Sequence, residues 1–360
     1  MGRGTRQVRL GKLPIGGGAS VSVQTMGNVD PHDVAACLAQ VTACAELGCD
    51  VFRLTVPDVE AARVLGEVRR ASPIPLVADV HFDYRCALAA LEAGVDALRL
   101  NPGNIGGREQ VAAVARAAKG KGVPIRIGVN GGSLEKPLAA AVAAGTLTRP
   151  QALVKSALGH LALLENEGFC DVVISAKASN AMETVETYRL LAEATDCPLH
   201  LGVTEAGTLL PGAVRSSVAL GILLSEGIGD TLRVSLTDRP EREVKVGLEI
   251  LRSLGLREPG PAVTSCPTCG RTKVDLFRVA TAVEEALERR YREVGQSAGR
   301  QFPRVAVMGC AVNGPGEAAG ADVALCGGDG EFLLYVHGKP VGKVSEPEAV
   351  GKVVEYAFPG

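Results

Sequence analysis

Short runs in which apolar and polar residues alternate recur along residues 20–250 of the 360-residue chain. This period of two is the period of a β-strand. The predicted strands are VSVQTM (21–26), VFRLTV (51–56), PLVADV (75–80), ALRLNP (97–102), IRIGVN (125–130), VVISAK (172–177), LHLGVT (199–204) and TLRVSL (231–236).

Most of these strands are separated by segments with helical spacing of their apolar residues. Examples are AACLAQVTACAELG (35–48), AARVLGEVRRA (61–71) and ETVETYRLLAEA (183–194). Strands alternating with helices indicate a parallel sheet, and eight such units indicate closure into a (β/α)8 TIM barrel. The longer gap between the fifth and sixth strands predicts an extra helix in GSLEKPLAAAVAAG (132–145).

The segment GLREPGP (255–261) is typical of a linker, and it predicts a barrel domain over 1–254 and a second domain over 255–360. After it we expect a loop TSCPTCGRT, a long helix over 274–294, a strand RVAVMG, a loop CAVNGPGEA, a strand ADVALC, a hairpin around HGKP and a helix over 346–357. This order predicts a small C-terminal α/β domain behind the barrel.

The two faces of the predicted strands differ in character. One face is apolar, as in Phe52, Leu54 and Val56, and suits packing against outer helices. The opposite face points into the barrel, mostly near the C-terminal strand ends where barrel enzymes place their active sites. Its polar residues are Arg53, Thr55, Arg99, Asn101, Arg126, Asn130, Ser175, Lys177, Arg233 and Ser235.

The converging cations need negative charge. Two guanidinium groups about 7 Å apart repel by about 2 kcal/mol at an effective dielectric constant of 20. Asp79 and Glu205 are the candidate internal partners, but five cations outnumber these two acids. Because arginine binds phosphate oxygens with two parallel hydrogen bonds, we interpret the barrel as the site of a phosphorylated substrate.

Composition limits the binding partners and the cellular location that we expect. The net charge of −2 provides no global attraction to nucleic acid or membranes, and no apolar run has the length of a signal peptide or a membrane span. We therefore expect a soluble, cytoplasmic enzyme. In that reducing compartment the ten cysteines are expected to be metal ligands or small core residues rather than disulfides.

Three cysteines have the pattern of a metal site. CPTCG (266–270) supplies Cys266 and Cys269, and Cys310 lies in a second glycine-rich loop. Three thiolates suit zinc or an iron–sulfur cluster, but a zinc ribbon needs a second knuckle, which favours the cluster. The candidates for the fourth ligand are Glu317 and Cys326; a carboxylate, as a hard donor on iron, would be the exchangeable ligand.

The other cysteines stand alone and are expected to pack in the core: Cys37, Cys44, Cys49, Cys86, Cys170 and Cys197. His81 ends the third predicted strand and is interpreted as a ligand-binding donor at the barrel mouth. The turn NPGNIGG (101–107) exposes backbone N–H groups of the kind that hold phosphate.

These motifs together resemble a known family. CPTCGRT and GCAVNGPGEA, with LRLNPGNIG, IRIGVNGGSLEK, PLHLGVTEAG and EGIGDTLRVSLT, are similar to the bacterial 4-hydroxy-3-methylbut-2-enyl diphosphate synthases of the non-mevalonate isoprenoid pathway. The resemblance extends along almost the whole chain. It departs from the family at QTMGNVD, where a turn richer in Thr and Ser is usual, and at Cys326, where a small residue without a thiol is usual.

The resemblance implies an oxidoreductase that opens the ring of 2-C-methyl-D-erythritol 2,4-cyclodiphosphate and eliminates water, using two electrons from ferredoxin or flavodoxin. It implies a 4Fe–4S cluster on Cys266, Cys269, Cys310 and Glu317, and homodimers in which the cluster domain of one subunit caps the barrel of the other. Glu205 matches a proposed proton donor. The implied substrate-binding residues are Arg53, Arg99, Arg126, Lys177, Ser235, Asn101, Asn130, His81 and Asn313.

Two other functions are compatible with part of the pattern. A zinc-stabilised binding module attached to a barrel would explain the cysteines. A pterin-dependent methyltransferase would explain a barrel with a polar mouth, but not the cysteines.

Overall fold

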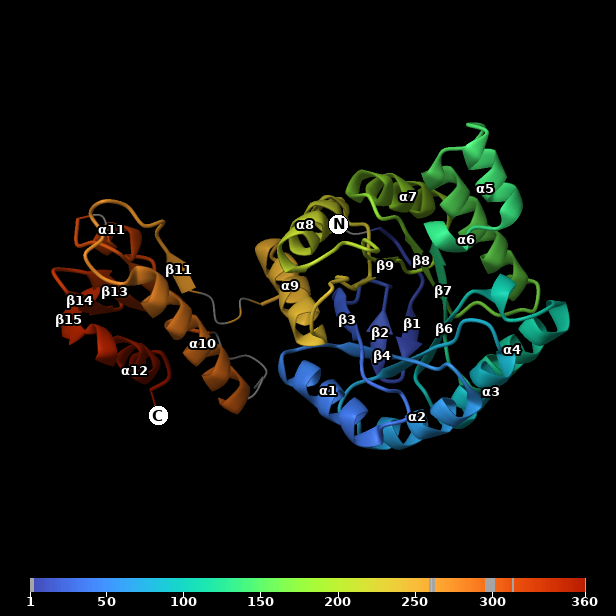
Figure 1. The fold of residues 1–360 in the computed structure, drawn as a ribbon, viewed down its shortest axis with the longest axis horizontal. Helices are drawn as coiled ribbons and strands as arrows, with labels where there is room; N and C mark the ends of the chain where they lie inside the picture. Colours follow the sequence, from blue (N-terminus) through green and yellow to red (C-terminus); the bar gives the residue numbers. More distant parts are fainter. Residues whose placement is uncertain (1–2, 259, 261–262, 295–301, 313, 360) are drawn as a thin grey trace. The chain divides into compact units, whose positions relative to one another are not determined.

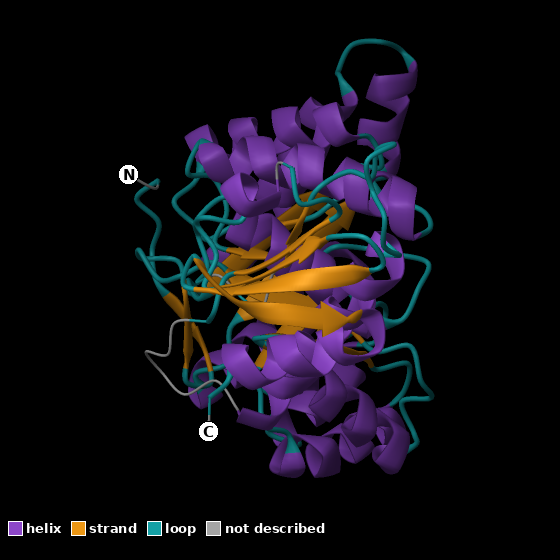
Figure 2. Cartoon of the chain, turned by 90° about the vertical axis from the view of Figure 1, so that its left-hand side faces the viewer, coloured by secondary structure: helices purple, strands orange, loops and turns teal. Residues whose placement is uncertain are grey.

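The computed structural model of the chain describes residues 3–258, 260, 263–294, 302–312 and 314–359. It divides into two compact units, Met1–Arg257 and Glu258–Gly360. Figure 1 shows helices surrounding a ring of strands in the first unit, and Figure 2 distinguishes the helices from the strands by colour.

The first unit is a closed parallel barrel, which confirms the predicted fold class. Eight strands lie in the order β8-β7-β6-β5-β4-β3-β10-β9, and a parallel bridge between Ile174 and Leu199 joins the two ends of that order. The strands are β3 (Ser22–Met26), β4 (Val51–Thr55), β5 (Leu76–Asp79), β6 (Ala97–Leu100), β7 (Ile125–Asn130), β8 (Val172–Lys177), β9 (His200–Leu201) and β10 (Thr231–Leu232).

The connecting helices form the outer layer of the barrel. They are α1 (Val34–Glu46), α2 (Val59–Ala71), α3 (Tyr84–Glu92), η1 (Pro102–Asn104), α4 (Arg108–Lys121), η2 (Gly131–Ser133), α5 (Lys136–Ala143), α6 (Arg149–Glu165), α7 (Ala181–Ala194), α8 (Leu209–Ser225) and α9 (Pro240–Ser253). Helix α5 is the extra helix predicted between the fifth and sixth strands.

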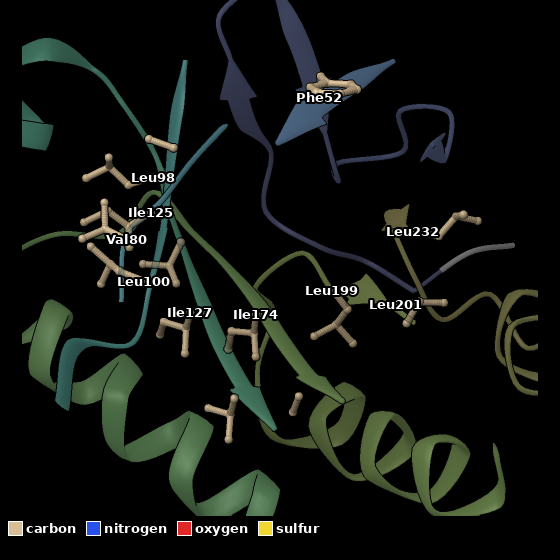
Figure 3. Packing of buried hydrophobic residues seen from close by; sticks show 14 of the residues in the cluster. Phe52, Val80, Leu98, Leu100, Ile125, Ile127, Ile174, Leu199, Leu201 and Leu232 are labelled. Atoms are coloured by element: carbon tan, nitrogen blue, oxygen red, sulfur yellow. The ribbon is translucent and has the colours of Figure 1, made fainter. Parts of the chain in front are cut away.

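The apolar faces of the strands pack against these helices, as their alternation predicts. Ile127 of β7 and Ile174 of β8 lie side by side and extend toward the helices (Figure 3). Both are fully buried in the main hydrophobic core, as is Phe52 of β4. With this face apolar, the opposite residues of each strand lie inside the barrel.

Strands β9 and β10 are shorter than their predicted ranges. The last ladder bond between them runs from the N–H of Arg233 to the oxygen of Leu201, at 3.0 Å. A Cβ atom on Gly202 would lie 2.5 Å from the oxygen of Arg233, so this close approach of the two segments requires a glycine. Regular pairing ends at Leu201 and Leu232.

A side chain strengthens the seam between β8 and β9. The hydroxyl of Tyr188, from α7, donates a hydrogen bond to the oxygen of His200 at 2.5 Å and accepts one from the N–H of Ala176 at 3.2 Å. Tyr188 is fully buried. It satisfies two backbone groups where the two strands share an isolated bridge instead of a ladder.

An N-terminal hairpin, absent from the predicted elements, lies over one end of the barrel. It pairs β1 (Val8–Leu10) with β2 (Leu13–Ile15) in antiparallel register. Its apolar side chains form a cluster with residues from the N-terminal parts of the barrel strands: Val8, Leu10, Ile15, Val51, Val77, Ala97 and Val173. The hairpin therefore seals the end of the barrel opposite the C-terminal strand ends.

The chain leaves the barrel at this sealed end. Both terminal nitrogens of Arg257 bind the carboxylate of Asp50 at 2.9 Å, and Asp50 directly precedes β4. This paired hydrogen-bond geometry anchors the last residue of the first unit on the N-terminal side of the strands.

The second unit is a small α/β domain, as predicted. Its sheet has the order β11-β12-β13-β14-β15, with the first three strands parallel and the last two antiparallel. Helices α10 and α12 share a core with the strands. The elements are β11 (Val263–Ser265), α10 (Leu276–Val294), β12 (Val305–Met308), α11 (Gly314–Glu317), β13 (Val323–Gly327), β14 (Glu331–Val336), β15 (Lys339–Ser345) and α12 (Glu346–Ala357).

The seam gives a first testable prediction. Tyr188→Phe leaves the carbonyl of His200 and the N–H of Ala176 buried without their partner, so we expect a loss of about 1–3 kcal/mol in the free energy of unfolding, measured with denaturant. Tyr84→Phe is the control, because its hydroxyl has no hydrogen-bond partner within the described part of the chain. Equal stability of the Tyr188 variant and the wild type would contradict this account of the seam.

Candidate functional site

Strand register brings the inward-facing polar residues together. Asp79 of β5 pairs with Arg99 of β6, and Arg99 pairs with Arg126 of β7. Four residues nearer the C-terminal end of β7, Asn130 pairs with Lys177 of β8. The sequence-predicted cations therefore form a continuous lining around the inside of the barrel.

Asp79 is the first of two carboxylates within this lining. It is 1% exposed, and its oxygens lie 3.0 Å from Nη1 of Arg99 and 3.6 Å from Nε of Arg53. Burial alone would raise the pKa of Asp79, but the Arg53 and Arg99 guanidinium groups outweigh it and hold that pKa below its usual value.

Arg99 is fixed by further contacts. Its Nη1 lies 3.0 Å from Nε2 of His81, and its Nη2 donates to the oxygen of Gly128 at 3.0 Å. A Cβ atom at residue 128 would lie 2.2 Å from Nε of Arg99. A glycine at this inward position of β7 is therefore what makes room for the Arg99 side chain.

Glu243 is the second internal carboxylate, and the sequence interpretation missed it. Its two oxygens accept hydrogen bonds from Arg233, at 2.8 and 3.0 Å, and one also accepts from the hydroxyl of Thr25 at 2.7 Å. Glu243 is 2% exposed although it lies in α9, an outer helix. Glutamate in a helix is usually exposed, so helical periodicity carried no sign of this role.

The expected carboxylate partner Glu205 does not pair with the cations. It is exposed in the loop after β9, and its backbone has a φ of +53°. The sequence interpretation named Asp79 and Glu205 as the internal partners of the cations, and for Glu205 it was wrong. The loop leaves the barrel lining soon after Leu201, so this side chain lies beyond the layer that holds Arg233.

Arg126 and Lys177 remain without a carboxylate partner among the described residues. Arg126 donates to Oε1 of Gln24 at 2.7 Å, while its Nε and Nη2 are buried without a hydrogen-bond partner. Burial, and then repulsion from neighbouring arginines, lowers the pKa of both groups well below their usual values. Gly202 gives space to Lys177, because a Cβ atom there would lie 2.5 Å from Nζ.

The interior of the described barrel therefore has an excess of positive charge. Five cations (Arg53, Arg99, Arg126, Lys177 and Arg233) share two buried carboxylates. Burial lowers the pKa of Arg53 to about 10, which shows how unfavourable its charge is in this setting. Such a lining is complementary to a bound polyanion.

The predicted polar residues at the mouth take defined positions. His81 is half-exposed beside Arg99, and the partial burial of its ring together with the nearby arginines lowers its pKa. The side-chain oxygens of Asn101 and Asn130 accept hydrogen bonds from the N–H groups of Gly103 and Gly132. The hydroxyl of Ser235 accepts one from Arg233 at 3.1 Å.

His200 is a further polar residue in the lining that the sequence interpretation missed. It is fully buried on β9, and neither ring nitrogen has a hydrogen-bond partner among the described residues. Burial and the charges of Arg126 and Lys177 lower its pKa well below the usual value, so it is neutral. The alternation in LHLGVT places it inward with Gly202, which was the available signal.

In the second unit, strand pairing brings the two cysteine loops together. Ser265 pairs with Val307, and the N–H of Gly309 donates to Sγ of Cys266 at 3.3 Å. The N–H of Cys269 donates to the hydroxyl of Thr272, which a Cβ atom on Gly309 would approach to 2.9 Å. Cys310 directly follows Gly309, so thiols from both loops lie at the same end of the sheet.

These loops have the donor chemistry of an iron–sulfur site, although the described side chains do not form a cluster of three or more metal ligands. The structure does not describe the side chain of Glu317, which ends α11, and Asn313 lies outside the described residues. The N–H bond to Cys266 is the kind that stabilises a cluster thiolate. The loops therefore fit such a group in donor type and in position along the sheet.

The remaining cysteines mostly match their expected packing role. Cys37, Cys44, Cys49, Cys86 and Cys197 are buried, and burial raises the pKa of Cys44 to about 12. Cys326 is buried in the sheet, where a Cβ atom on Gly314 would lie 3.1 Å from its sulfur. Cys170 is exposed, so its predicted place in the core was wrong; it lies in the turn before β8.

Across the described residues no helix combines the length and the apolar character that crossing a bilayer requires.

Comparisons with known proteins extend these observations. The family model described as the GcpE TIM-barrel domain matches residues 5–248, and the one described as the GcpE protein C-terminal domain matches residues 262–357. A protein of Maridesulfovibrio salexigens named 4-hydroxy-3-methylbut-2-en-1-yl diphosphate synthase (flavodoxin) is 54% identical over 344 residues, covering 96% of this chain and 93% of that protein. A protein of the same name from Geobacter sulfurreducens is 52% identical over 350 residues, covering 97% and 96%.

Among solved structures, type I 3-dehydroquinate dehydratase from Clostridium difficile resembles the chain with a TM-score of 0.50 at 14% identity. The match covers 69% of this chain and 98% of that one, and it concerns the fold alone.

The electrostatics of the lining give a prediction on pH. Because the pKa of Asp79 is lowered by folding, its stabilisation is complete above its unfolded pKa of 3.8 and is lost as the pH falls through the lower folded value. We expect Asp79→Asn to cost about 3–5 kcal/mol at neutral pH, since it leaves buried arginines unpaired, and to cost progressively less below pH ~4.

Denaturant unfolding of the barrel between neutral and acid pH measures this difference. The exposed Asp171→Asn serves as the matched control and should change stability little at any pH. If the difference in unfolding free energy between wild type and Asp79→Asn stayed constant with pH, this carboxylate would not hold the arginines in place.

Proposed function

The chain belongs to the GcpE family, and on this premise we propose that it is a 4-hydroxy-3-methylbut-2-enyl diphosphate synthase. The reaction converts 2-C-methyl-D-erythritol 2,4-cyclodiphosphate, two electrons and two protons into the linear diphosphate and one water. The relatives give no support to the zinc-module or pterin-methyltransferase alternatives. The observation that carries the proposal is the excess of cations inside the barrel.

We propose that this lining binds the cyclic diphosphate. Arg126 and Lys177 have no carboxylate partner among the described residues, so phosphoryl oxygens would supply the missing negative charge. Arg53, Arg99 and Ser235 extend the same surface, and Asn101, Asn130 and His81 lie near its mouth. Because Asp79 and Glu243 already hold three of the arginines, the site is organised before the substrate arrives.

We propose Cys266, Cys269, Cys310 and Glu317 as the residues that hold a 4Fe–4S cluster. When bound, such a cluster supplies the two electrons in single steps. The chain's own contribution is to bring the two loops together and to direct the N–H of Gly309 at a thiolate sulfur, which tunes the reduction potential. Asn313 stays a prediction for a residue close to the substrate.

Glu205 is the proposed proton donor. Its carboxyl group lies in an exposed loop that follows β9, on the C-terminal side of the cationic lining. A carboxylic acid at the mouth would deliver a proton to the departing oxygen and be reprotonated from solvent. The left-handed backbone at this residue fixes the direction of the side chain at some cost in strain.

We propose flavodoxin as the electron donor, since the names of the relatives specify it. The sequence by itself does not distinguish ferredoxin from flavodoxin. The buried thiols of Cys37, Cys44, Cys49, Cys86 and Cys197, which form no disulfides, and a protein electron carrier fit the reducing cytoplasm, which we propose as the location.

We also propose a homodimer in which each cysteine domain serves the barrel of its partner. The support is the position of the connection: the first unit ends at Arg257, which is anchored to Asp50 on the side of the barrel opposite the strand ends that carry the mouth.

Cys310→Ser tests the cluster. We expect it to abolish the brown colour, bound iron and turnover, because two thiolates are too few to hold the cluster, while pyrophosphate still raises the thermal midpoint of the barrel. Cys170→Ser, which changes an exposed cysteine of the barrel, should keep colour and turnover. Full iron content in Cys310→Ser would overturn the proposed ligand set.

Mixing two inactive variants tests the dimer. Cys310→Ser removes the cluster of a subunit and Arg126→Ala impairs its barrel, so a mixed dimer of the two retains one intact barrel facing one intact cysteine domain. We expect refolding of the mixture to restore roughly a quarter of the wild-type activity, since half of the dimers are mixed and each has one working site. No recovery in a mixture shown to contain mixed dimers would contradict sharing between subunits.

A further inference from the structure

A contact on the outer side of the barrel, between buried His160 and partly exposed Glu135, lies outside the chemistry described so far. His160 of α6 is 4% exposed, and its Nε2 lies 2.9 Å from Oε1 of Glu135. The same oxygen accepts a hydrogen bond from the hydroxyl of Ser156 at 3.0 Å. Neither ring nitrogen of His160 forms a hydrogen bond among the described residues, so Glu135 restrains the ring through close contact.

The ring of His160 packs against the turn that follows β6. A Cβ atom on Gly103, in the middle of η1, would lie 2.5 Å from Cε1 of His160 and 3.2 Å from its Nδ1. Gly103 has no positive φ, so its backbone would accept another residue. Contact with the imidazole is therefore what requires a glycine here.

This turn carries a residue of the proposed substrate site. Oδ1 of Asn101 accepts the N–H of Gly103 at 3.2 Å and so caps η1. That bond directs Nδ2 of Asn101 the other way, and this nitrogen is buried without a hydrogen-bond partner among the described residues. An unpaired buried donor beside the cationic lining is suited to a ligand oxygen.

We propose that His160, held by Glu135, is a positioning residue that fixes the Asn101–Asn104 turn and so directs Nδ2 of Asn101 at a phosphoryl oxygen. The inference rests on the proposed diphosphate function. It assigns a role to the insertion between β7 and β8, because Glu135 immediately precedes the additional helix α5 and His160 lies in α6. This segment between β7 and β8 therefore supports the Asn101–Asn104 turn from the outer side of the barrel, without touching the substrate.

Two substitutions and their combination test the contact. His160→Ala removes the support, and Gly103→Ala places a methyl group against the imidazole and displaces the turn. We expect each to weaken binding of inorganic pyrophosphate about tenfold, as for the loss of one hydrogen bond to a charged group. In the double variant the methyl group has the space of the missing ring, so pyrophosphate should bind more tightly than to Gly103→Ala alone.

Calorimetric titration of the full chain with pyrophosphate measures these affinities, with thermal unfolding recorded in parallel. Leu164→Ala is the matched control: it truncates another buried side chain of α6, one turn further on, and should lower stability with unchanged affinity. Additive losses in the double variant, or wild-type affinity in His160→Ala, would overturn the positioning role while leaving the diphosphate site standing. Absence of saturable binding to the wild type would overturn the site and the inference together.

Discussion

The structure depends on unmatched positive charge inside a closed barrel. Five cations converge where two buried carboxylates are available, and two of the cations, Arg126 and Lys177, have no acidic partner among the described residues. Burying unmatched charge is costly, and under the proposed function the phosphoryl oxygens of a doubly charged substrate would offset this cost and so contribute to the binding free energy.

Much of the scaffold can be understood as holding these charges in place. Glycines at inward positions, Gly128 and Gly202, leave the volumes that the side chains of Arg99 and Lys177 fill. Asp79, on β5, and Glu243, beside β3 and β10, position three arginines, and the N-terminal hairpin seals the far end with apolar side chains. The open end is consequently the polar one, and the proposed function requires water to be excluded there during the reductive step.

The alternation of strand residues was sufficient to predict the barrel and the inward direction of its cations, because a period of two assigns each residue to a face. It was insufficient for Glu243, which reaches the lining from a helix, and for the hairpin over Val8–Ile15, whose strands are too short to show a period. His200 was missed because a histidine among apolar residues has no distinctive pattern. Motif spacing was sufficient to propose Cys266, Cys269 and Cys310 as one ligand set, but the contact of Gly309 with Cys266 depends on strand register that spacing does not encode.

The most direct test of this account is calorimetric titration of the chain with 2-C-methyl-D-erythritol 2,4-cyclodiphosphate at several salt concentrations. If the cationic lining is the binding site, the titration will show one ligand per barrel, an affinity that falls with added salt and competition by pyrophosphate. Binding that is absent, or that is saturable yet insensitive to both salt and pyrophosphate, would contradict the claim that the excess charge of the barrel exists to bind the substrate's diphosphate.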